Sequence, residues 1–437
     1  MPGSHKGRNR SIIAIALVTA AILVGGTTAV GAGSSRNAEK ASAANVASIE
    51  PMATCPPGGP TGPGWSFETL DGGGGTCIDV NVGAYNAVLI FNGQPHVWYY
   101  DATGGNLRHG WWNGTAWQFE TLDGVPGPNG RIDSNVGTFN AVLIFNGQPH
   151  VWYVDNTGGN LRHGWWNGTA WQFETLDGVP GPNGRIDSIV GAYSAALIYG
   201  GQPHVWYYDD TGGNLRHGWW NGTAWQFETL DGVLGPNGRI DGNVGAYSAA
   251  LIYGGQPHVW YYALTGNNLR HGWWDGTAWQ FETLDGALGP NGRIEGNVGW
   301  YSTVLIYNGQ PHVWYYDDTG GNLRHGWWNG TAWQFETLDG VLGPNGRIGG
   351  IVGMDNAAII YGGLPHVWYY DLTNGYLRHS WWNGTAWQFE TLDGNGGTNG
   401  RINGIVGSFN AVLLYGGKPH VWYYDFFGGN LRHGWWN

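Results

Sequence analysis

Short runs of alternating apolar and polar residues occupy most of this chain, and turn-forming residues separate them. Between residues 86 and 122 there are four such runs, at 86–91, 96–101, 107–112 and 117–122. Asn92-Gly93 separates the first two runs, and Asn-Gly between aromatic runs is typical of a tight hairpin turn. Aromatic and β-branched residues in runs of this length favour strands. The pattern therefore predicts four short antiparallel strands.

The four-run pattern returns at a fixed spacing along the chain. The segment Pro95-His96-Val97-Trp98-Tyr99 is repeated every 54 residues, and Leu107-Arg108-His109 with Trp111-Trp112 keeps the same register. The later copies of His96 are His150, His204, His258, His312, His366 and His420. A period of this length indicates a repeat architecture. Seven repeats of four antiparallel strands predict an all-β fold, a seven-bladed β-propeller over residues 62–437.

The two ends of the repeat region complement each other. The last repeat stops at Trp435-Trp436-Asn437, after its third strand, whereas residues 65–71 match the fourth strand at 117–123. We expect the N-terminal strand to complete the last blade and close the ring, since closure removes a free sheet edge. A linear solenoid would need capping repeats at its ends rather than one repeat divided between them.

Composition agrees with this fold and limits the partners. The chain has 80 Gly and 29 Trp, whereas charged residues make up only 11%. The straight-chain residues that helices prefer are scarce. The net charge is −12 and no basic stripe is present, so nucleic acid is not an expected partner. No cofactor is expected either.

The N-terminal segment has the layout of a secretory signal peptide, which we place at 1–32. Basic residues from His5 to Arg10 precede an apolar stretch at 12–24, and Val30-Gly31-Ala32 offers a cleavage site. An uncleaved membrane anchor is the alternative, although the apolar stretch is short for a span. The mature protein is then expected to be secreted and extracellular, without a membrane span. Residues 33–61 have the composition of a flexible linker.

Two cysteines, Cys55 and Cys77, are the whole cysteine content of the chain. Export would place them in an oxidising compartment, where a disulfide between them is expected. Two unrelated free thiols are the alternative.

One stretch of the repeat carries a family resemblance. Residues 106–114 (NLRHGWWNG), with Trp117 and residues 119–124 (FETLDG), resemble the blade repeat of bacterial seven-bladed propeller lectins of the Photorhabdus lectin type. They are more distantly similar to six-bladed fucose-specific lectins. The resemblance implies binding of glycans, often fucose or methylated sugars, in clefts between blades. In the six-bladed relatives an Arg and a carboxylate hold the sugar, and the nearest positions here are Trp98 and His109.

Strand alternation places the candidate sugar-binding residues on one blade face. With even-length hairpin loops, Trp98 lies opposite His109 and His109 opposite Glu120. An indole can stack on the C–H face of a pyranose, while His and Glu bind its hydroxyls. The set returns as Trp152, His163 and Glu174; Trp206, His217 and Glu228; Trp260, His271 and Glu282; Trp314, His325 and Glu336; Trp368, His379 and Glu390; and Trp422, His433 and Glu68.

The same residues have structural alternatives. Blades pack face to face, so Trp at fixed positions is also expected as core, and a His–Glu pair can be a satisfied core hydrogen bond. The two His series lie on neighbouring strands, but no copy shows a third ligand at metal-binding spacing, and no metal site is expected. Asn113-Gly114-Thr115 is a glycosylation sequon, yet Asp275 in the fourth copy indicates that turn geometry explains the pattern.

Repetition also bears on the class of function. An active site is usually one asymmetric set of groups, whereas every candidate here is repeated. We therefore expect a multivalent lectin rather than an enzyme, because linked weak sites gain avidity. A non-catalytic scaffold for protein–protein interaction is the alternative, and oligomerisation stays open.

Overall fold

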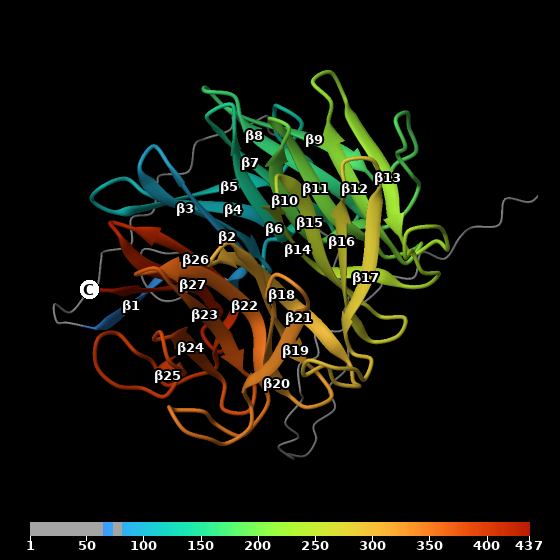
Figure 1. The fold of residues 1–437 in the computed structure, drawn as a ribbon. Coiled ribbons are helices and arrows are strands. Elements are labelled where there is room, and N and C mark those ends of the chain that lie inside the picture. The colour runs from blue at the N-terminus through green and yellow to red at the C-terminus, as the bar shows by residue number, and fades with distance from the viewer. Residues whose placement is uncertain (1–63, 73–80) are drawn as a thin grey trace, which may run out of the picture. The chain divides into compact units, whose positions relative to one another are not determined.

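Seven four-stranded antiparallel sheets make up the folded part of the chain, which is a seven-bladed β-propeller (Figure 1). The structure is a computed structural model, and it describes residues 64–72 and 81–437. Within these residues no helix is long and apolar enough to cross a membrane. The predicted signal peptide, the linker at 33–61 and both Cys55 and Cys77 lie outside the described residues. The predicted fold class is confirmed.

Each blade runs from a ten-residue first strand to a seven-residue fourth strand. The first three blades comprise β2 (Val82–Phe91), β3 (Gln94–Asp101), β4 (Asn106–Trp112) and β5 (Trp117–Asp123); β6 (Val136–Phe145), β7 (Gln148–Asp155), β8 (Asn160–Trp166) and β9 (Trp171–Asp177); and β10 (Val190–Tyr199), β11 (Gln202–Asp209), β12 (Asn214–Trp220) and β13 (Trp225–Asp231). The fourth, fifth and sixth blades comprise β14 (Val244–Tyr253), β15 (Gln256–Ala263), β16 (Asn268–Trp274) and β17 (Trp279–Asp285); β18 (Val298–Tyr307), β19 (Gln310–Asp317), β20 (Asn322–Trp328) and β21 (Trp333–Asp339); and β22 (Val352–Tyr361), β23 (Leu364–Asp371), β24 (Tyr376–Trp382) and β25 (Trp387–Asp393). The seventh blade comprises β26 (Val406–Tyr415), β27 (Lys418–Asp425) and β28 (Asn430–Trp436), and β1 (Trp65–Asp71) completes it.

The seventh blade joins the two ends of the repeat region. Strand β1 pairs antiparallel with β28, so that Phe67 lies opposite Gly434 and Glu68 opposite His433. The backbone N–H of Asn437 donates to the carbonyl of Gly64 at 3.0 Å. The N-terminal strand therefore takes the place of the fourth strand, which confirms the predicted closure.

Two turns show why the repeat folds as it does. Asn92 and Gly93 have φ values of 50° and 75°, the left-handed conformation that a two-residue hairpin turn requires. The Asn113 carboxamide oxygen accepts hydrogen bonds from the backbone N–H groups of Thr115 and Ala116, both at 2.9 Å. In the fourth blade the Asp275 carboxylate makes the equivalent bonds at 2.8 Å. The turn interpretation of the sequon pattern is thus confirmed.

The hydrophobic core lies between the blades. One cluster combines Trp98 and Leu107 of the first blade with Val151, Tyr153 and Phe173 of the second, all buried. Burying a large apolar side chain contributes roughly 1.5–3 kcal/mol. Each blade is therefore held mainly by its neighbours, and the ring is stable as a unit.

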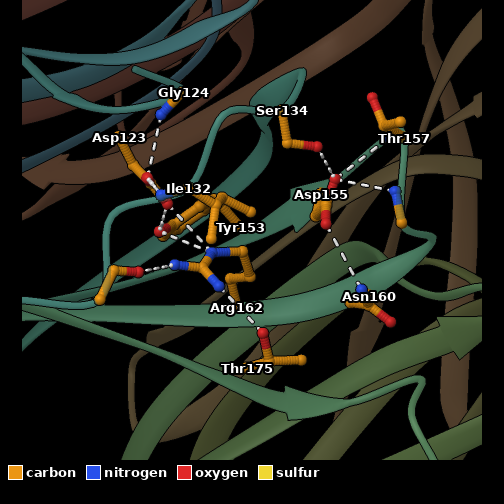
Figure 2. A network of polar contacts seen from close by, with 12 residues as sticks. Asp123, Gly124, Ile132, Ser134, Tyr153, Asp155, Thr157, Asn160, Arg162 and Thr175 are labelled. Atoms are coloured by element: carbon orange, nitrogen blue, oxygen red, sulfur yellow. Dashed lines mark hydrogen bonds and ion pairs between the residues drawn. The ribbon is translucent and has the colours of Figure 1, made fainter. Parts of the chain in front are cut away.

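A buried ion pair ties each blade to the next (Figure 2). In the second blade, the Arg162 Nε–H and the Tyr153 hydroxyl donate to Asp123 Oδ2 of the first blade, at 3.0 and 2.6 Å. Asp123 Oδ1 accepts from the backbone N–H groups of Gly124 and Ile132, at 2.9 and 2.8 Å. The same pair recurs as Asp71–Arg108, Asp177–Arg216, Asp231–Arg270, Asp285–Arg324, Asp339–Arg378 and Asp393–Arg432. The first of these links β1 to the first blade.

Candidate functional site

The predicted register of the candidate residues is correct. Trp98 lies opposite His109 across β3 and β4, and His109 lies opposite Glu120 across β4 and β5. His96 lies on the same face, two residues before Trp98 along β3. The structure thus brings the predicted residues of each copy together on one face of their blade.

A chain of hydrogen bonds joins the polar members of this face. His109 Nδ1 lies 2.9 Å from Glu120 Oε1, and His96 Nδ1 lies 2.9 Å from His109 Nε2. An ionised carboxylate only accepts, so His109 carries its proton on Nδ1, its Nε2 accepts, and His96 donates from Nδ1. Burial, followed by the neighbouring His109, lowers the pKa of His96 to about 3. The chain therefore fixes the Glu120 carboxylate through two successive imidazoles.

The stacking role predicted for Trp98 is wrong. Its side chain is 0% exposed, lies parallel to the His109 ring at 4.6 Å, and meets the edge of Trp171 from the next blade at 6.1 Å. No face of the indole is left for a sugar, because blades pack face to face. The correction extends to its equally buried counterparts Trp152, Trp206, Trp260, Trp314, Trp368 and Trp422.

Trp111 is an aromatic residue of this face that solvent reaches. It is half-buried, and its ring stacks on His109 with centroids 5.1 Å apart. Strand alternation already placed Trp111 on the same face as His109, so the sequence carried the signal. What the alternation could not give was the depth of each ring within the interface between blades.

The Glu residues are the accessible polar members. The side chains of Glu120, Glu174, Glu228, Glu282, Glu336 and Glu390 are between 35 and 42% exposed, whereas Glu68 is 10% exposed. The His109 series is buried, with His163, His217, His271, His325, His379 and His433 in the same position. His therefore orients the carboxylate, and six similarly exposed carboxylates stand beside a seventh, less exposed one at the ring closure.

The following blade adds an aromatic ring beside the buried His of each blade. The Trp171 indole meets the His109 ring edge-on at 5.7 Å. At the ring closure and between the fifth and sixth blades, the equivalent indole N–H donates to the preceding Glu at 3.3 Å. The half-exposed Glu120 carboxylate and the half-buried Trp111 indole lie on one face of the blade. They offer a hydrogen-bond acceptor and an apolar wall, the usual plan of a small-molecule site.

A second concave feature lies at the centre of the ring, and the sequence reasoning missed it. The first strand of each blade carries a β-bulge, between Ala84 and Ala87 in the first blade, where Tyr85 has a φ of 56°. The residues at this position line a cavity of about 180 Å³ and are here called the channel ring. Its members are Tyr85, Phe139, Tyr193, Tyr247, Tyr301, Asp355 and Phe409.

Asp355 is the one member of the channel ring that is not aromatic. It retains partial exposure to the cavity, but protein encloses it otherwise, and this burial raises its pKa to about 7 against a weaker opposing hydrogen bond from the Phe409 backbone. The signal was present in Met354-Asp355-Asn356, where every other repeat has an aromatic residue in the middle.

Comparison with known proteins extends to the fold only. The sequence matches no protein-family profile and no curated protein. Solved structures similar to this chain include YCF48 from Cyanidioschyzon merolae, with a TM-score of 0.46 and 12% identity over 84% of this chain and 98% of that one. A thermostable family-43 glycoside hydrolase has a TM-score of 0.39 and 13% identity over 64% and 98%. An exo-β-1,3-galactanase from Phanerochaete chrysosporium has a TM-score of 0.38 and 10% identity over 86% and 96%.

These neighbours correct one expectation. The chain was expected not to be an enzyme, but glycoside hydrolases stand among the structures that resemble it. The premise of strict repetition also fails, because Asp355 has no counterpart in the other blades. The likeness to the Photorhabdus-type lectins stays a prediction, with the seven-bladed propeller as its confirmed part.

Proposed function

We propose that this protein binds glycans in the clefts between its blades, as a secreted, multivalent carbohydrate-binding protein. The observation that carries the proposal is the Glu120 carboxylate, half-exposed and held at 2.9 Å by His109 beside the half-buried ring of Trp111. A carboxylate accepts strong, charge-assisted hydrogen bonds from sugar hydroxyls. An indole ring suits the C–H face of a pyranose.

Preorganisation supports this assignment. Glu120 is fixed by a buried imidazole that is itself fixed by His96, so little side-chain freedom remains to be lost on binding. Each cleft is shallow, and a monosaccharide should bind weakly to one of them. Six similar clefts on one ring then strengthen attachment to a glycan-coated surface through effective concentration. This is why the proposed ligand is a surface rich in repeated glycan ends.

The test combines a glycan array with calorimetric titration of one sugar that the array identifies. Changing Glu120 and its six counterparts to Gln keeps the shape and the acceptor for His109 but removes the charge. We expect this variant to stay folded and to lose sugar binding, and the single change Glu120→Gln to lower the number of sites. Asp275→Asn is the matched control, because it removes a carboxylate from an exposed turn that is Asn in the other complete hairpins.

Two results would overturn the proposal. One is the absence of any glycan ligand for the unaltered protein on a broad array. The other is unchanged sugar affinity in the variant that lacks all seven carboxylates.

A further inference from the structure

The ring-to-ring contacts of the channel ring are interrupted at one position. Its aromatic rings contact one another in an unbroken arc, with neighbouring centroids between 4.2 and 4.6 Å apart. The arc begins at Tyr301 and ends at Phe409. Between them stands Asp355, whose side chain has no ring and lines the cavity of about 180 Å³. A ligand would meet a carboxylate at this gap, with an aromatic ring on either side.

The Asp355 carboxylate accepts from the backbone of Phe409, and unlike the Asp123 series it has no Arg partner in the cavity lining. The Asp123 series is paired with Arg, as shown by Asp123 and Arg162 at 3.0 Å. The Asp101 series accepts from backbone N–H groups of its own turn, as Asp101 does from Thr103 and Gly104. None of the residues that line the cavity is Lys, Arg or His. A negative charge at Asp355 thus has no cation to balance it within the lining.

A second row of cavity-lining residues contributes four Asn side chains whose amide oxygens are buried. Asn356 and Asn410, on the sixth and seventh blades, donate through Nδ2 to the backbone carbonyls of Tyr301 and Asp355, at 3.1 and 3.0 Å. Asn86 and Asn140, on the next two blades, donate in the same way. The Oδ1 atoms of all four have no hydrogen-bond partner among the described residues. The lining therefore offers a ligand the Asp355 carboxylate as its one charged acceptor, beside the hydroxyl groups of its Tyr and Ser residues.

We propose that the central cavity binds a small primary ammonium ion, with its N–H groups directed to Asp355 and its alkyl carbon against the rings of Tyr301 and Phe409. An aromatic wall attracts a cation through the ring faces, and the carboxylate adds a charge-assisted hydrogen bond. A resident metal ion is a poorer fit, because no three His, Cys, Asp or Glu side chains converge in the described part of the chain. The site is separate from the clefts between blades.

The test uses butylammonium as the probe and 1-butanol as its neutral counterpart, followed by ligand-observed NMR and calorimetry. Both run at about pH 8, above the Asp355 pKa of about 7, so that the carboxylate is ionised while the amine stays charged. We expect saturable binding of butylammonium with a single site per chain, and none of 1-butanol.

Two variants and one control assign the site. Asp355→Asn keeps the size and removes the charge, whereas Asp355→Tyr supplies the ring that other blades carry and fills the gap. Each should weaken butylammonium about ten-fold or more, the worth of one charged hydrogen bond. Asp275→Asn removes a carboxylate from an exposed turn that is not part of the channel lining. This control should leave the affinity unchanged.

The outcomes separate this proposal from the glycan proposal. Equal affinity in Asp355→Asn and the unaltered protein, equal binding of 1-butanol, or no butylammonium binding at all would each overturn it. Should Asp355→Asn fail to fold, Asp355→Tyr decides, because Tyr occupies the same position in four other blades. Sugar binding should be the same in both Asp355 variants, and butylammonium binding the same in the Glu120→Gln series.

Discussion

Changing Asp123 to Ala removes the centre of the contact between the first and second blades. Four donors then lose their acceptor: the guanidinium of Arg162, the hydroxyl of Tyr153, and the backbone N–H groups of Gly124 and Ile132. The Asp123 side chain is 0% exposed, so water cannot replace it without opening the interface. Breaking a buried pair by removing one partner costs about 3–5 kcal/mol. This is a large share of the ~5–15 kcal/mol that holds a typical domain together.

The loss in free energy of unfolding should come from the guanidinium of Arg162, which stays buried without its carboxylate partner, rather than from the lost attraction itself. Arg162→Met alone should therefore cost less than Asp123→Ala, because the Asp123 carboxylate keeps Tyr153 and two backbone N–H donors. Combining Asp123→Ala with Arg162→Met should recover part of the loss, since replacing both members of a buried pair by apolar groups can be nearly neutral. Urea unfolding followed by tryptophan fluorescence gives the three free energies of a double-mutant cycle.

Two results would refute this reasoning. A loss below about 1 kcal/mol for Asp123→Ala would mean that the interface accommodates an unpaired guanidinium. Strictly additive losses in the double variant would mean that Asp123 and Arg162 act independently, despite the 3.0 Å contact between them.

Three further predictions concern closure and pH. Deleting the residues up to Gly72 removes buried Trp65, Phe67 and Leu70, so the free energy of unfolding should fall by roughly 5 kcal/mol; an unchanged melting temperature would contradict the closed ring. The pKa of His96 is lowered to about 3 by burial, so between pH 6.5 and 3 the unfolded chain binds more protons and stability should fall on acidification; a flat melting temperature between pH 7 and 4 would count against this. The raised pKa of Asp355, about 7, acts in the opposite direction, because the folded state then holds the extra proton between pH 4 and 7. Asp355→Tyr should therefore gain melting temperature over the unaltered protein as the pH rises through that range, and a pH-independent difference would show that Asp355 does not titrate there.

The fold could be predicted from the sequence because every repeat carries the same pattern of strands and turns. Seven turns at the Asn92-Gly93 position and six at the Asn113-Gly114 position fix the hairpins, and the split between residues 65–71 and the last repeat fixes the closure. The register also followed, since alternation within even-length hairpins leaves one pairing for His109 and Glu120. The seven repeats thus gave several independent copies of the same local pattern from which to predict the fold.

The site was only partly predictable, because alternation gives the face of a residue but not its depth. Trp98 and Trp111 share a face, yet Trp98 is buried under the next blade and Trp111 is half-buried. Asp123, before Gly124, has the pattern of a turn residue, and its pairing with Arg162 comes from the adjacent blade, 39 residues away. Asp355 was visible as a departure from the repeat, but its meaning depends on six rings brought together by the whole ring.

Because the first and last strands share one blade, the position of the chain ends around the ring can be changed without altering the order of the blades. The backbone of Asn437 already contacts Gly64 at 3.0 Å, so a short peptide could link them and the chain could be opened at an exposed hairpin such as 113–116 instead. Such a circular permutant would lose the hydrogen bonds of the opened turn, keep the pairing of strands within each blade, and change the order of synthesis. In the native order, β1 is made first and stays without its partner until β28 follows. The pairing that closes the ring is thus the longest-range strand pairing among the described residues. Long-range pairings form slowly because the entropy of loop closure is lost before the contacts form. A permutant opened elsewhere would show whether the rate of ring formation is set by the position of the chain ends or by the packing of blade on blade.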